Sequence, residues 1–160
     1  MTGACPAPSA GTFNALVWLS GVVSGFLIQL IVRLFVTRAA GIQARTDELC
    51  DAVRSLASAS HEYWSLEPDD PGVTKAEAEL SAANHIMNCL AGIVIELKPS
   101  LKGKLSDAVF ALSNDATGSN FQVHNRAADV YRYRTVQGRA MIILGDLRRF
   151  QQGTWVRTFG

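Results

Sequence analysis

Hydrophobic and polar positions divide the chain into one uninterrupted apolar run and several stretches with a helical period. From Phe13 to Val32 the sequence reads FNALVWLSGVVSGFLIQLIV, twenty residues without a charged side chain. A helix of that length spans about 30 Å and matches the hydrocarbon core of a bilayer. We therefore expect a transmembrane helix over residues 13–36, preceded by a short extracytoplasmic N-terminus at residues 1–12.

Charges on either side of the apolar run predict its direction. Residues 1–12 carry no charged side chain, whereas Arg33, Arg38 and Arg45 follow the run. The positive-inside rule then places the N-terminus outside and the C-terminus in the cytoplasm, as a single pass through the plasma membrane. A cleaved secretory signal is the alternative, but it needs a positive start and a shorter apolar run.

One face of the expected span carries small residues and one amide. Close approach of two helices at the glycines would let the amide bond across to a partner, so the span is expected to associate with a second copy. The alternative is that small residues are simply common in membrane helices and that the amide bonds its own backbone. The residues of this face are Ser20, Gly21, Ser24, Gly25 and Gln29.

A lone cysteine lies in the expected extracytoplasmic segment. Cys5 has no second cysteine on its side of the membrane, so it either stays free or forms an intermolecular disulfide between two copies.

The rest of the chain predicts a helical bundle over residues 40–152. Polar or proline-containing breaks at 68–72, 98–100 and 113–120 separate segments whose apolar residues recur in steps of three and four. Helices are expected at 42–66, 74–97, 101–114 and from 129 to about 152, with a tail at 153–160. The first of them can run on from the span. The predicted fold is all-α, one N-terminal transmembrane helix followed by an antiparallel bundle of about four helices.

Three local signals predict how these helices begin and end. Thr74 and Glu77 are spaced as a capping box. Gly118 is expected to close the third helix in a left-handed turn. Asp129 is expected to cap the start of the last helix.

Charge is unevenly distributed although the total is only +1. Residues 40–125 contain 6 basic and 12 acidic side chains, hence −6, and residues 126–160 contain 7 and 2, hence +5. We expect these two regions to pair within the chain; the alternative is that the basic last helix rests on anionic lipid or nucleic acid. Nucleic-acid binding is not expected, because Tyr131 and Tyr133 of the YRYR stretch point to different sides of a helix.

Catalytic and metal-binding motifs are not recognisable in the sequence. His85 and Cys89 share a helix face, and Cys50, His61 and Glu62 lie on the neighbouring helix, but a buried, reduced thiol is the favoured interpretation. No phosphate-binding, dinucleotide or zinc-protease motif occurs. We therefore expect a non-enzymatic protein without a cofactor or metal.

Two stretches resemble a group of small bacterial membrane proteins of unassigned role. They are SDAVFALSNDATGSNF at 106–121 and RAADVYR at 126–132, similar to a DATGGDF-like loop before a last helix. Ser119 and Asn120 depart from that pattern, which has a second glycine and an acid there. The resemblance implies a bacterial inner membrane and a helical cytoplasmic domain, without an activity. The loop residues themselves favour backbone turns over partner recognition.

Two functions remain as hypotheses. The first is a membrane-anchored helical adaptor, with lipid, a second copy and a cytoplasmic protein as partners. The alternative is a membrane-perturbing oligomeric effector of the phage-defence or toxin type, whose spans associate and open a leak. The span has little polar surface to line a water-filled path, which favours the adaptor.

Overall fold

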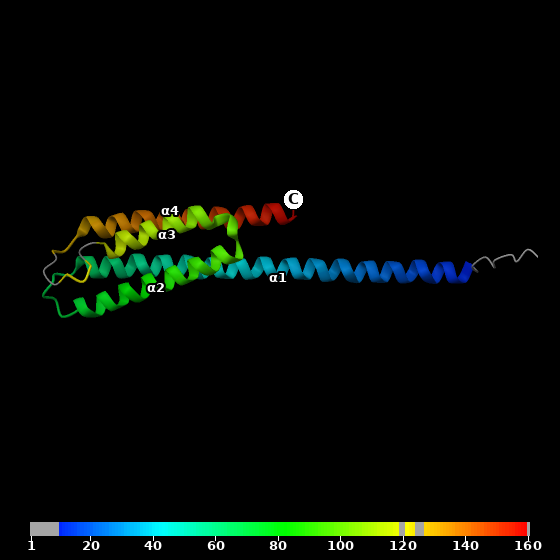
Figure 1. Cartoon of the computed structure of the whole chain (residues 1–160), viewed down its shortest axis with the longest axis horizontal. Helices are drawn as coiled ribbons and strands as arrows, with labels where there is room; N and C mark the ends of the chain where they lie inside the picture. Colours follow the sequence, from blue (N-terminus) through cyan, green and yellow to red (C-terminus); the bar gives the residue numbers. More distant parts are fainter. Residues whose placement is uncertain (1–9, 119–120, 124–126, 160) are drawn as a thin grey trace, which may run out of the picture. The chain divides into compact units, whose positions relative to one another are not determined.

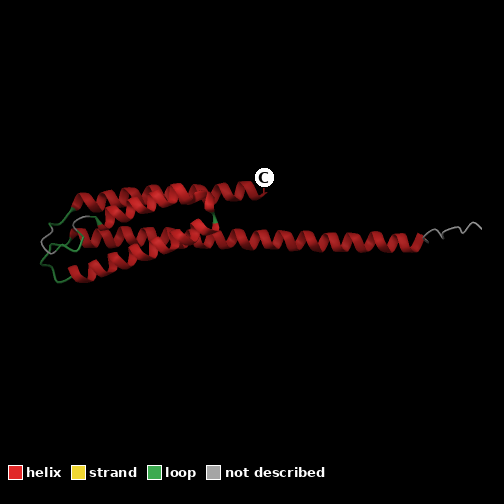
Figure 2. Ribbon diagram, in the orientation of Figure 1, coloured by secondary structure: helices red, strands yellow, loops and turns green. Residues whose placement is uncertain are grey.

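The computed structural model describes residues 10–118, 121–123 and 127–159, with side chains for 23–118, 121–123 and 127–152. Within these ranges every regular element is helical, as predicted (Figure 2). The elements are α1 (Ala10–Ser65), α2 (Val73–Leu97), the 3-10 turn η1 (Pro99–Leu101), α3 (Lys102–Thr117) and α4 (Val130–Phe159).

Contacts within the chain define two compact units, Met1–Gly41 and Ile42–Gly160. Helix α1 contributes residues to both, since no proline interrupts it and Gly41 is tolerated within it. The expected helices at 13–36 and 42–66 are therefore parts of one element. Cys5 lies outside the described residues, and so do the side chains of Ser20 and Gly21.

The second unit is a bundle in which α1 from Ile42 onward packs with α2, α3 and α4, and successive helices run in opposite directions (Figure 1). Its core consists of residues spaced three and four apart, as an apolar stripe on each helix requires. The main contributors are Leu49, Val53, Leu56, Tyr63 and Trp64 from α1; Leu80, Met87, Ala91 and Val94 from α2; Leu105, Val109, Leu112 and Ala116 from α3; and Val136, Ala140, Ile143 and Leu147 from α4.

The helical period makes Leu97 the last position of the apolar seam of α2, together with Leu80, Met87 and Val94, but Leu97 is 39% exposed. The helix ends at this residue and the chain turns away into η1, so the last seam position has no neighbour to cover it. Ala91 is buried in the seam instead.

The start of α2 also differs from prediction. The helix begins at Val73, and no side chain caps its first turn, so Thr74 is not the N-cap. Asp70 instead stabilises the turn before the helix. Its carboxylate accepts a hydrogen bond of 2.8 Å from the Gly72 amide, and its carbonyl accepts one of 3.1 Å from the Val73 amide. An aspartate that bonds the backbone two residues on is a common turn former.

The segment between α3 and α4 gives one correction and one confirmation. Gly118 has a φ of −49°, so it does not form the predicted left-handed turn. The positive φ falls on Gln122, at 66°. Asp129 does cap α4, because its carboxylate accepts a 2.9 Å hydrogen bond from the Arg132 amide. Helix α4 continues past Gly153, where the tail was expected, to Phe159.

Two helices in the described part of the chain are long and apolar enough to cross a membrane: α1 over Val23–Ser65, and α2 over Val73–Leu97.

Candidate functional site

The predicted association face lies on a part of α1 that its own chain does not cover. Ser24, Gly25 and Gln29 are exposed. A Cβ atom added at Gly25 would meet no atom within 4 Å, so the glycine leaves open space at the helix surface. Large apolar side chains surround this face, each between 46% and 65% exposed; they are Val23, Phe26, Leu27, Ile28, Leu30, Ile31, Val32, Leu34, Phe35 and Val36.

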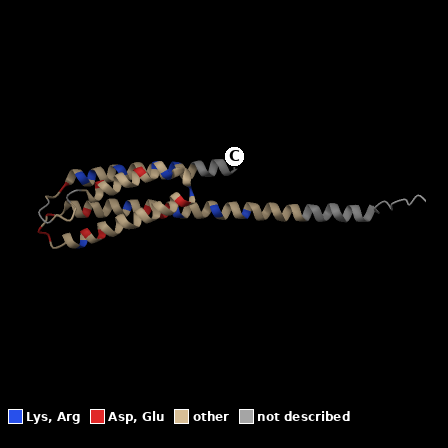
Figure 3. Cartoon of the chain, viewed as in Figure 1, with Lys and Arg blue, Asp and Glu red and all other residues tan. Residues whose placement is uncertain are grey.

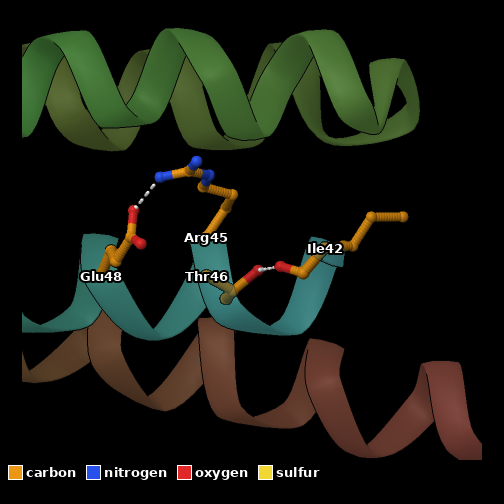
Figure 4. A network of polar contacts seen from close by, with 4 residues as sticks. All are labelled: Ile42, Arg45, Thr46 and Glu48. Atoms are coloured by element: carbon orange, nitrogen blue, oxygen red, sulfur yellow. Dashed lines mark hydrogen bonds and ion pairs between the residues drawn. The ribbon is translucent and has the colours of Figure 1, made fainter. Parts of the chain in front are cut away.

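The three arginines used to predict topology belong to both units. Arg33 and Arg38 are exposed in the first unit, and Arg45 lies in the bundle. Arg45 forms an ion pair of 2.6 Å with Glu48 beside the buried Thr46, whose hydroxyl donates to the Ile42 carbonyl at 2.8 Å (Figure 4). Exposed pairs of this kind contribute at most about 1 kcal/mol.

The loop that follows α3 packs onto the end of α1 in the bundle. The indole of Trp64, which is 1% exposed, donates a 2.9 Å hydrogen bond to the Ala116 carbonyl, and the Arg132 guanidinium stacks 4.4 Å from its ring. Any larger residue at Gly118 would displace this guanidinium, because its Cβ atom would lie under 3 Å from the Arg132 head group. The Tyr63 hydroxyl accepts a 3.2 Å hydrogen bond from the Gln122 amide. These contacts support the structural interpretation of the loop.

A groove of about 460 Å³ between α1 and α4 was not predicted from the sequence. Arg54 and His61 lie on its α1 side, and Gln137 and the exposed Met141 lie on its α4 side. Its lining comes from helices some eighty positions apart, so only the packed fold brings the residues together. The groove thus combines hydrogen-bonding side chains with the flexible thioether of Met141.

In the described part of the chain, two reactive side chains lie close together on α2. His85 Nε2 and Cys89 Sγ lie 3.6 Å apart on exposed α2. Among the described side chains, no group of three or more histidines, cysteines or carboxylates could hold a metal ion. Cys50 is buried, and desolvation raises the pKa of its thiol above the usual value, which keeps it protonated and unreactive.

No protein-family model, curated protein or solved structure matches the chain. The resemblance carried by residues 106–132 therefore rests on the quoted stretches alone.

Proposed function

We propose that this chain is a non-enzymatic, single-pass adaptor that α1 anchors in a bacterial inner membrane, with its helical bundle in the cytoplasm. The exposed apolar surface of Val23–Val36 carries the proposal. Burying one such side chain contributes about 1.5–3 kcal/mol, so ten of them left half exposed favour transfer into an apolar phase. The bundle has a core of its own, and we assign the groove between α1 and α4 to a cytoplasmic protein partner.

Topology is tested by protease treatment of membrane vesicles. In inverted vesicles the bundle should be digested, because it faces the medium. In right-side-out vesicles it should be protected. Digestion in right-side-out vesicles would reverse the proposed orientation, and recovery of the chain in the soluble fraction would contradict the anchor itself.

Self-association of the span is tested by Gly25→Leu, with Leu27→Ala as the matched control. A leucine at the open glycine should hold two helices apart and weaken association in the membrane by about tenfold, a loss of about 1.4 kcal/mol. Removal of Leu27, outside the small-residue face, should have little effect. A resonance-energy-transfer assay in vesicles measures both, and equal association of the two variants would contradict the interface.

The same variants separate the adaptor from the effector. During induced expression of the whole chain, an adaptor leaves the membrane potential unchanged. Depolarisation that Gly25→Leu abolishes would instead support an oligomeric effector that acts through its span.

A further inference from the structure

Two turns at opposite ends of the bundle carry opposite charges (Figure 3). The acidic turn, Glu67–Asp70, joins α1 to α2 and contains Glu67, Asp69 and Asp70. The basic turn, Leu97–Lys104, joins α2 to α3 and contains Lys98, Lys102 and Lys104 without an acid. The 25 residues of α2 separate the turns by about 37 Å.

The basic turn lies at the end where α1 enters the bundle. Lys98 Nζ lies 4.2 Å from the centre of the Phe150 ring on α4. The neighbouring Gln151 donates a 2.7 Å hydrogen bond from Nε2 to Oδ1 of Asp47 on α1. Asp47 is only five positions beyond Ile42, where the unit begins, so these contacts place the three lysines at that end.

Local interactions do not explain Lys102 and Lys104. Lys102 and Lys104 occupy the first turn of α3, where the helix dipole disfavours a cation. Both are exposed, and no ion pair within the described residues includes either. Glu96 and Asp107 are the nearest acids along the chain, and they flank the turn rather than lie in it.

Exposed apolar surface accompanies the charge. Leu97, which leaves the predicted seam, is 39% exposed and stands directly beside Lys98, and Pro99 is exposed as well. A surface that combines lysines with aliphatic side chains is typical of segments that lie at the headgroup level of a membrane.

We propose that the basic turn binds the anionic headgroups of the membrane that holds the span, which rests on the anchoring proposed above. Val36, the last residue of the expected span, and Ile42 are only six positions apart. Six helical residues cover about 9 Å, close to the Debye length of physiological solution. An anionic leaflet therefore attracts these lysines, by about fivefold for each one close to the surface. The acidic turn is repelled by the same surface.

The experiment uses the four lysines that the chain contains. The full-length protein is inserted into nanodiscs of phosphatidylcholine alone, or of phosphatidylcholine with one third phosphatidylglycerol. An uncharged amine-acetylating reagent then labels the lysines, and mass spectrometry gives a rate for each. Lys75, near the start of α2 and 3.5 Å from Glu79, is the internal control.

Labelling of Lys102 and Lys104 should slow about fivefold in the anionic discs, with recovery in 0.5 M salt and no change at Lys75. Insertion with equal rates in both lipids overturns this inference and leaves the anchor standing. A similar slowing at Lys75 also overturns it, because the effect would not be confined to the turn. Failure of the chain to enter either disc overturns both proposals.

Discussion

The apolar part of α1 and the whole of α2 look alike in hydropathy but differ in what their side chains contact. Both are long and apolar enough to cross a membrane. None of the most apolar window of α1 is buried within the chain, whereas 22% of the corresponding window of α2 is. The buried fraction of α2 is a continuous seam that includes Leu80, Met87 and Val94.

This difference shows why hydropathy alone does not assign a helix to a membrane. A bundle helix needs one apolar stripe, and α2 has that stripe packed against its neighbours while Ile86 and Ile93 remain on the outside. The segment Val23–Val36 exposes ten large apolar side chains, and the bundle covers none of them. Apolar surface of that extent calls for lipid or a partner.

The largest effect, a loss of unfolding free energy, is expected when a buried residue of α2 is truncated. Leu80 is fully buried, so Leu80→Ala removes packed methyl groups and leaves a cavity, at a loss of about 3–5 kcal/mol in the free energy of unfolding. Ile86→Ala is the matched control on the same helix: Ile86 is 52% exposed, and the expected loss is under about 1 kcal/mol. Thermal unfolding in mild detergent, followed by circular dichroism, measures both, and equal losses would mean that α2 does not pack as described.

The second largest effect is expected from an added charge, which should lower membrane insertion when it lies on α1 but not when it lies on α2. Ile28→Arg puts a guanidinium inside the proposed span, which disfavours insertion by about 2.5–3.5 kcal/mol and should shift the chain out of the carbonate-resistant membrane fraction. Ile86→Arg adds the same charge to the outer face of α2 and should leave that fraction unchanged. The reverse result would identify α2 as the spanning helix.

Periodicity predicted the helical class and most of the core. Leu49, Val53 and Leu56 repeat with the helical period, and each is buried. The cap at Asp129 was also predictable, because its bond to Arg132 depends only on residues three apart. Such features are local and therefore readable along the sequence.

Features that depend on distant contacts were not predictable. Gly118 was predicted from its backbone freedom, yet its φ is negative, and the space beside it is filled by the guanidinium of Arg132, fourteen positions away. The groove at Arg54 and Gln137 forms only when α1 and α4 pack. The position of the basic turn beside Phe150 likewise follows from the bundle rather than from any motif.

The smallest effect is expected in the alkylation rates of two cysteines, which compare α1 and α2 within the bundle. Cys50 of α1 is 5% exposed, whereas Cys89 of α2 is exposed. In the bundle the buried thiol therefore belongs to α1 and the accessible thiol to α2. At pH 8 an uncharged alkylating reagent should modify Cys89 at least about tenfold faster than Cys50, because the thiolate reacts and burial suppresses it. Peptide mass spectrometry gives both rates, and comparable rates would contradict the burial of Cys50.

The same burial predicts a pH dependence whose sign can be worked out. Desolvation raises the pKa of Cys50 in the folded chain above its unfolded value, so the unfolded chain releases this proton first as the pH rises. The stability contributed by Cys50 is thus complete below the unfolded pKa, near 8.5, and is lost as the pH rises through the folded pKa. Cys50→Ala should therefore flatten the decline in unfolding free energy between about pH 8 and 10, whereas Cys89→Ala should leave it unchanged. If the unfolding free energy of Cys50→Ala declined as steeply as that of the unsubstituted protein, the decline would be due to other titrating groups.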